Sequence, residues 1–234
     1  MQDLLDAFAT AFSLLLHFDP DLMEIVALSF EVSLCALAAA ALIGLSLGAL
    51  VAVLRFPGRQ LALVLLNALM GLPPVVVGLV VYLVLSRSGP LGFLGWLFTF
   101  KALVLAQFIL ITPIVAALSR GVVEDLWEEY EEQLRSLGTG PLRMIPTLLW
   151  DGRHRLVTVI LAGFGRAIAE VGAVIIVGGN IAHVTRVMTT AIALETSRGD
   201  LALALGLGIV LLLLSLAVNA GASLGGAIAQ RVEG

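Results

Sequence analysis

Charged residues, cysteines and histidines are scarce in this chain of 234 residues. Only 13% of the residues are charged, whereas a soluble domain carries about 25%, so an ordinary soluble domain is excluded. The single cysteine, Cys35, lies in an apolar run, and a disulfide within the chain is therefore impossible. The three histidines stand far apart without the spacing of metal ligands, and we expect no metal site.

Motifs for nucleotide binding and hydrolytic chemistry are also missing. The only lysine, Lys101, stands between Phe100 and Ala102, so the chain has no phosphate-binding loop of the Gly-Lys-Ser/Thr type. It has no His-Glu-x-x-His, no paired aspartates and no Gly-x-Ser-x-Gly. We therefore expect no enzymatic activity, no cofactor on this chain and no nucleic-acid partner, and an intramembrane enzyme is the weakest alternative.

Apolar residues dominate what is present. They make up 60% of the chain, and the mean hydropathy is +1.07. Several runs approach or exceed the roughly 20 residues that cross a bilayer as a helix. The pattern predicts an all-α polytopic membrane protein with five spans, at about 24–54, 60–86, 101–120, 156–178 and 201–229.

The first 19 residues precede the predicted membrane domain, which we place at 20–234. Apolar residues recur here near helical spacing, at Leu4, Leu5, Phe8, Phe12, Leu15 and Leu16. The segment has Asp3 and Asp6 but no basic residue, so a signal peptide is not expected. The spacing favours an amphipathic helix lying in the membrane interface over residues 1–19, in contact with lipid. A loosely ordered leader is the alternative.

Arginine and lysine are distributed unevenly over the predicted loops. Eight arginines fall in the first loop, the third loop and the C-terminus, namely Arg55, Arg59, Arg120, Arg135, Arg143, Arg153, Arg155 and Arg231. Four basic residues fall on the opposite side, namely Arg87, Lys101, Arg186 and Arg198. Because cytoplasmic loops are enriched in basic residues, we expect the N-terminus outside and the C-terminus in the cytoplasm.

Prolines interrupt two of the predicted spans. Pro73 and Pro74 remove two backbone donors from the second span, and Pro113 removes one from the third. Such breaks are tolerated in a membrane where protein or water satisfies the backbone. We predict helix breaks at these prolines and a path through the bundle, although prolines are also common in ordinary membrane helices.

The third loop, at about 121–155, is long and polar. Acidic residues crowd its start, where a helix dipole favours anions, and Leu126, Trp127, Tyr130, Leu134 and Leu137 fall near one helical face. The Gly-Thr-Gly-Pro stretch at 138–141 ends that helix, and a second short segment with a break at Pro146 follows. We predict two short cytoplasmic helices whose apolar face docks a partner.

The stretch from Tyr130 to Gly138, YEEQLRSLG, resembles the EAA loop of ABC importer permeases. Glu132 stands six residues before Gly138, as in that motif, while Gln133 and Leu134 replace its two alanines and Leu148–Asp151 replaces its downstream Ile-x-Leu-Pro. The resemblance implies a coupling helix that inserts into a groove on an ATPase subunit. The implied coupling residues are Glu131, Glu132, Leu134, Leu137, Gly138, Gly140 and Pro141.

A second stretch, GRAIAEVGAVIIVGGNI at 165–181, is similar to permeases for molybdate, tungstate and sulfate, as is LPPVVVG at 72–78. The shared positions are Arg166, Glu170, Gly172, Gly179 and Asn180, and residues 182–200 look most like the tungstate branch. The resemblance implies the type I ABC importer permease fold in the cell (inner) membrane. It further implies a homodimer, two ATPase subunits that carry ATP and Mg²⁺, and an extracytoplasmic binding protein that delivers tungstate or, alternatively, molybdate or sulfate.

Arg166 and Glu170 lie inside the fourth predicted span, four residues apart on one helical face. Charges at this depth are costly and mark functional or paired groups. One interpretation is a structural ion pair, and the other is a polar lining in which Arg166 faces the anion. An ion-coupled secondary transporter that uses the pair as a relay is the competing function. It leaves the third loop without a role, and no inverted repeat is evident.

Overall fold

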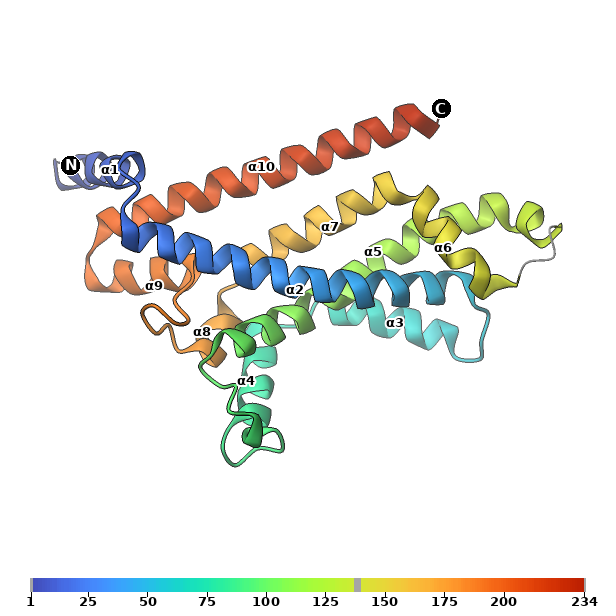
Figure 1. Ribbon diagram of the computed structural model, residues 1–234, viewed down its shortest axis with the longest axis horizontal. Helices are drawn as coiled ribbons and strands as arrows, with labels where there is room; N and C mark the ends of the chain where they lie inside the picture. Colours follow the sequence, from blue (N-terminus) through green and yellow to red (C-terminus); the bar gives the residue numbers. More distant parts are fainter. Residues whose placement is uncertain (1, 137–139, 234) are drawn as a thin grey trace. The chain divides into compact units, whose positions relative to one another are not determined.

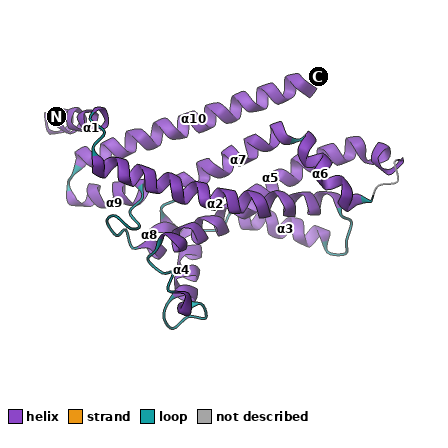
Figure 2. Cartoon of the chain, in the orientation of Figure 1, coloured by secondary structure: helices purple, strands orange, loops and turns teal. Residues whose placement is uncertain are grey.

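The structure is a computed structural model that describes residues 2–136 and 140–233. All regular structure in these two ranges is helical, as Figure 2 shows, and no strand occurs in them. The all-α prediction is therefore confirmed.

Among the described residues, three helices are long and apolar enough to cross a membrane, and two pairs of shorter helices count as one span each if their breaks are included. The total of up to five spans agrees with the five predicted. The long helices are α2 (Pro20–Val53), α5 (Phe100–Ser136) and α10 (Leu201–Glu233). The pairs are α3 (Arg59–Met70) with α4 (Pro74–Leu85), and α7 (Arg153–Ile168) with α8 (Gly172–Gly178). The remaining helices are α1 (Gln2–Leu16), the 3₁₀ turn η1 (Gly92–Leu94), α6 (Pro141–Asp151) and α9 (Met188–Arg198) (Figure 1).

The second span is interrupted where two prolines stand. α3 ends at Met70, Pro73 has an extended backbone with φ −65° and ψ 119°, and α4 begins at Pro74. A proline suits the first position of a helix, because the missing N–H has no partner there in any case. The prolines thus end one helix and start the next.

Pro113 and Pro146 lie inside continuous helices, although the sequence predicted a helix break at each. α5 continues through Pro113, and α6 continues through Pro146, so the prediction of a helix break at each is wrong. Each proline removes a single backbone donor from its helix. The helices continue on both sides because the adjacent turns keep their hydrogen bonds, and the Thr112 hydroxyl also donates to the Phe108 carbonyl at 2.7 Å.

α5 also extends farther than predicted. The third span was expected to end near residue 120 and to be followed by a separate loop helix, but one helix of 37 residues runs from Phe100 to Ser136. At about 1.5 Å per residue, this length exceeds a hydrocarbon core of about 30 Å. No proline follows Pro113 within α5, so nothing local ends the helix at the membrane boundary.

The chain divides into two compact units. The first comprises Met1–Ala36, Pro73–Gln107 and Arg166–Ala217, and the second comprises Leu37–Leu72, Phe108–Gly165 and Val218–Gly234. Each unit is built from segments that are distant in the sequence.

In the first unit, α4 packs on α8 (Figure 1). A Cβ atom at Gly78 would lie 2.7 Å from Cα of Ala173, and one at Gly172 would lie 2.8 Å from Cγ2 of Val75. Both separations are too short for real atoms. The two helices therefore approach closely because these positions lack a side chain.

In the second unit, glycines again allow close approach. A Cβ atom at Gly44 in α2 would lie 2.9 Å from Cγ1 of Val115 in α5, and one at Gly163 in α7 would lie 3.0 Å from Cδ1 of Leu37. Ser119 is fully buried and donates to the Gly44 carbonyl at 3.4 Å. This packing positions the part of α5 that continues toward the polar segment.

Candidate functional site

The first half of the predicted docking face lies inside the protein. Leu126 and Trp127 are each only 5% exposed, and a Cβ atom at Gly152 would lie 2.9 Å from Cδ1 of Leu126. The prediction that these two residues contact a partner is therefore wrong. Their apolar surface is used to pack α5 within the second unit, since burial of large apolar side chains stabilises a fold.

Arginines hold the acidic part of α5 in place. The Arg59 guanidinium donates to the Glu124 carboxylate at 2.7 Å and to the Val51 carbonyl at 3.0 Å. Arg120, one turn before Glu124, pairs with the second carboxylate oxygen. Arg59 thus joins the last turn of α2 and the first turn of α3 to α5. Sequence reasoning counted Arg59 for orientation only, because nothing local indicates a partner 65 residues away.

Two further contacts attach α5 to the segment that follows it. Arg155 forms an ion pair with Asp125, and the Asp151 carboxylate lies near the Tyr130 hydroxyl. The negative charges of Asp151 and then of Glu129 raise the pKa of Tyr130, which therefore stays neutral and remains a donor. α5 is therefore in contact with the last residue of α6, Asp151, and with the first turn of α7 through Arg155.

α6 has one buried and one exposed apolar face. Met144 and Leu148 are 2% and 1% exposed, whereas Leu142 and Trp150 are 58% and 72% exposed. The Arg153 guanidinium lies over the Trp150 ring, 5.1 Å from its centroid. Large apolar side chains that project from a braced helix are typical of a contact surface.

The predicted coupling residues fall between and beside these helices. Glu131 lies 3.7 Å from Arg55, and Glu132 is exposed. Gly140 has an extended backbone, and Pro141 is the first residue of α6. The side chain of Leu134 and all of Leu137 and Gly138 lie outside the described part of the chain.

In the first unit, Arg166 and Glu170 form an ion pair at the end of α7. Glu170 is 3% exposed, and its other carboxylate oxygen accepts a hydrogen bond from the backbone N–H of Ala173 at 3.1 Å. The Glu170 carbonyl accepts one from the Thr189 hydroxyl at 2.7 Å. Glu170 therefore connects α7, the start of α8 and the start of α9. Each of its acceptor groups is engaged by the protein itself.

Gly179 and Asn180 form the turn that ends α8. Their backbones have φ values of +69° and +50°, a left-handed conformation that glycine and asparagine adopt more readily than other residues. The Asn180 amide donates to the Thr190 carbonyl at 3.2 Å and accepts from the Thr190 hydroxyl at 2.9 Å. Both predicted residues thus shape the turn between α8 and α9.

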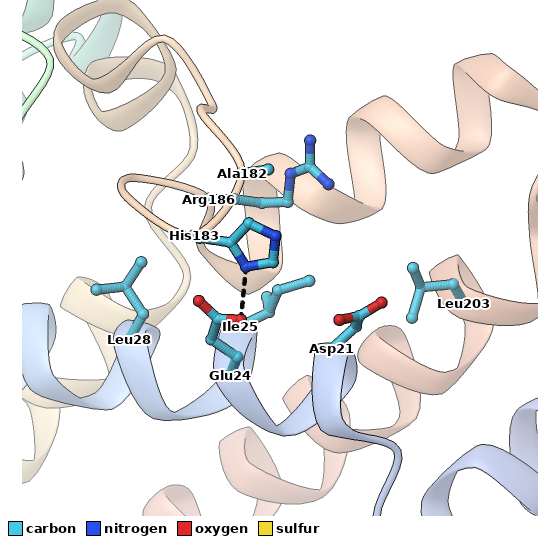
Figure 3. Close-up of a pocket in the computed structure, with 8 residues that line it drawn as sticks. All are labelled: Asp21, Glu24, Ile25, Leu28, Ala182, His183, Arg186 and Leu203. Atoms are coloured by element: carbon cyan, nitrogen blue, oxygen red, sulfur yellow. Dashed lines mark hydrogen bonds and ion pairs between the residues drawn. The ribbon is translucent and has the colours of Figure 1, made fainter.

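A pocket of about 100 Å³ in the first unit was not foreseen from the sequence. It lies between the first turns of α2 and the segment after α8, and Figure 3 shows the His183 ring pointing at Glu24, with Nδ1 and Oε2 2.8 Å apart. Asp21 and Arg186 also line it. Among the described residues, no group of three metal-ligating side chains comes together. The hydrogen bond between His183 and Glu24 joins the start of α2 to the segment after α8.

Comparison with known proteins gives a consistent result. Residues 42–231 match the family described as "binding-protein-dependent transport system inner membrane component". The chain is 41% identical over 220 residues to a tungstate uptake system permease protein of Peptoclostridium acidaminophilum, which covers 94% of this chain and 96% of the relative. It is 40% identical over 185 residues to a probable anion ABC transporter permease protein of Haloferax volcanii, covering 77% and 80%. It is 33% identical over 176 residues to a sulfate transport system permease protein of Escherichia coli (strain K12), covering 70% and 58%.

Proposed function

Because this chain belongs to the family of binding-protein-dependent transport system inner membrane components, we propose that it is the permease subunit of an ATP-driven importer for an oxyanion. Tungstate is the proposed substrate, ahead of molybdate or sulfate. The relative named for tungstate is more similar to this chain, and over more of its length, than the relative named for sulfate. ATP and Mg²⁺ belong to a separate ATPase subunit in this proposal.

The braced pair of α5 and α6 carries the proposal. The exposed apolar face of α6, formed by Leu142 and Trp150, is the surface that enters a groove on the ATPase. Because ion pairs join α5 to α7 and to the first turn of α3, a force on α6 acts on several helices at once. The predicted coupling segment 131–141 connects these two helices. A secondary transporter would have no use for such a surface.

The assembly follows from the family role. Two copies of this chain form the pore and bind two ATPase subunits in the cytoplasm, and an extracytoplasmic binding protein delivers the anion on the other side. The excess of arginine in the segments that contain α5 and α6 supports a cytoplasmic location for them and for the C-terminus, with the N-terminus outside.

The Arg166–Glu170 pair has a structural role in this proposal. Glu170 accepts hydrogen bonds from Ala173 and Thr189 as well as pairing with Arg166. Removing one partner of a buried pair is strongly unfavourable, while the intact pair is close to neutral. Arg166 therefore serves to neutralise the carboxylate that starts α8, rather than to hold the anion.

α1 lies in the membrane interface in this proposal. Phe8, Phe12 and Leu16 follow one stripe of the helix and are 45%, 60% and 66% exposed. Ala11, on another stripe, is fully buried and lies near Gly206 of α10. The outward stripe thus has the composition of a lipid contact. No arginine or lysine occurs before Arg55, so apolar burial and not attraction to anionic lipid drives this contact.

Uptake of tungsten, molybdenum and sulfur by cells with and without the gene, measured by elemental mass spectrometry at submicromolar oxyanion, tests the proposal. Loss of tungsten uptake alone is the expected result. Loss of molybdenum or sulfate uptake instead would change the substrate and keep the permease role. Unchanged uptake of all three elements, or failure to copurify with an ATPase subunit, would contradict the proposed function.

A further inference from the structure

Gln107 is a buried amide in α5 that uses only half of its hydrogen-bonding capacity. The residue is 3% exposed, and its Nε2 donates to the Ala167 carbonyl at 3.2 Å. Its Oε1 is enclosed and has no hydrogen-bond partner within the part of the chain that the structure describes. Burying an acceptor without a partner costs about 1–3 kcal/mol, so this arrangement requires an explanation.

The bond that Gln107 makes is dispensable in this conformation. The Ala167 carbonyl also accepts a hydrogen bond from the backbone N–H of Glu170 at 3.1 Å. Removing the Gln107 side chain would therefore leave no backbone group without a partner. An apolar side chain of similar size would avoid the unpaired oxygen. The stability of this conformation does not account for a glutamine at the site.

The location of the Gln107–Ala167 hydrogen bond suggests a reason for the glutamine. Ala167 stands one residue before the end of α7, and three residues, 169–171, connect α7 to α8. Thr189 and Ala173 hold Glu170 through hydrogen bonds in which both partners are satisfied. Within the described residues, Gln107 contacts this break from α5 with an incomplete set of hydrogen bonds. Short connections between helices are where hinge motions are absorbed.

A direct contact with the transported anion does not fit. The Ala167 carbonyl can only accept hydrogen bonds, so the amide group that faces it is the donor Nε2, and Oε1 points away. A free carbonyl oxygen accepts hydrogen bonds and repels a deprotonated oxyanion, which has only acceptors. Oε1 therefore requires a donor from the protein or from water.

We propose that Gln107 is a positioning residue for translocation, which contacts the α7–α8 break in this conformation and completes its hydrogen bonds when the break moves. The inference rests on the proposed function, because it needs a second conformation in a transport cycle. The unpaired Oε1 disfavours the present conformation slightly and so keeps the second one accessible. An apolar residue here would leave the present conformation intact and would weaken the other.

The test uses the permease assembled with its ATPase in proteoliposomes. Gln107→Met removes both hydrogen-bonding groups at nearly constant volume, and Gln107→Leu is a second variant in case the first folds poorly. Thr189→Val is the matched control, because it removes a hydrogen bond in which both partners are satisfied. Melting temperature is measured without nucleotide and with a non-hydrolysable ATP analogue, and ATP-driven oxyanion uptake is measured alongside.

Gln107→Met is expected to keep or raise the melting temperature without nucleotide and to reduce the stabilisation by the ATP analogue. It should lower uptake about three- to tenfold, which is the effect of one lost hydrogen bond. Thr189→Val should lower the nucleotide-free melting temperature. If Gln107→Met behaves like Thr189→Val, the role is only structural and the inference is overturned. It is also overturned if Gln107→Met changes neither uptake nor the response to the analogue. Wild-type complex without ATP-driven uptake would contradict the proposed function itself, and the two failures are thus distinguishable.

Discussion

Arg59 and Glu124 are 65 residues apart in the sequence, and their side chains meet at 2.7 Å. The same guanidinium donates to the Val51 carbonyl in the last turn of α2. One side chain therefore joins the end of α2, the start of α3 and the polar half of α5. The joint lies between membrane-spanning helices and the segment proposed to contact the ATPase.

Arg59→Ala should uncouple ATP hydrolysis from uptake. The substitution leaves Glu124 with Arg120 alone and should lower the free energy of unfolding by about 1.5–3 kcal/mol, the range for hydrogen bonds to charged groups. The ratio of oxyanion imported to ATP hydrolysed in proteoliposomes measures the effect. Arg55→Ala is the control. The Arg55 side chain is 81% exposed, its guanidinium lies 3.7 Å from the Glu131 carboxylate, and exposed pairs of this kind contribute little to stability. Equal effects of both variants would contradict a special role for Arg59.

Leu142→Glu and Trp150→Ala should weaken binding of the ATPase without unfolding the permease. Exposed aromatic anchors commonly contribute 2 kcal/mol or more to an interface, so affinity should fall about 30-fold for Trp150→Ala. Copurification with the tagged ATPase, together with the melting temperature of the permease alone, checks this. Leu148→Ala, at a buried position, should instead lower the melting temperature. If both exposed-face variants bind the ATPase fully, the docking surface is not the exposed face of α6.

Gly78→Ala should destabilise the first unit. The added Cβ would lie 2.7 Å from the backbone of Ala173, so α4 and α8 would have to separate, at about 1–3 kcal/mol. Gly121→Ala provides a control in α5, because nothing lies within 4 Å of its added Cβ and alanine favours a helix by about 0.5–1 kcal/mol. Thermal unfolding in detergent should show opposite shifts. A shift of the same sign for both would show that the α4–α8 contact is looser than described.

Arg166 and Glu170 should tolerate replacement together better than separately. Glu170→Ala removes the partner of Arg166, whose side chain is 34% exposed, and the acceptor of the Ala173 N–H, which should cost about 1.5–3 kcal/mol. The double variant Arg166→Gln with Glu170→Gln removes both charges and keeps an acceptor near Ala173. We expect the double variant to retain uptake. If it folds but does not transport, Arg166 contacts the anion, and the structural role assigned above is wrong.

α1 should place Phe12 in lipid and Thr10 in water. After Cys35→Ser, a nitroxide attached at Phe12→Cys should be more accessible to oxygen than to a polar nickel complex, and the order should be reversed at Thr10→Cys, about half a turn away. Replacing zwitterionic by anionic lipid should change neither, because the segment has no basic residue. Equal accessibility at the two positions would indicate that α1 does not lie in the interface.

Sequence alone determined those features that depend on local composition. The apolar runs predicted the three long helices and the two bent helix pairs found in the described residues, because the cost of exposing or burying a stretch of about 20 residues depends mainly on the stretch itself. Pro73 and Pro74 marked a real interruption, because two consecutive missing donors cannot be absorbed by one helix. The Arg166–Glu170 ion pair was likewise predictable, because two residues four apart lie on one helical face.

Tertiary structure decided everything that depends on a partner far away in the chain. It buried Leu126 and Trp127 within the protein, so that the exposed apolar face lies on α6 instead. It also brought Arg59 to Glu124, and Gln107 to the break after α7. A side chain's nearest neighbours in a bundle are set by helix packing, and packing depends on contacts between segments that no local pattern of residues specifies.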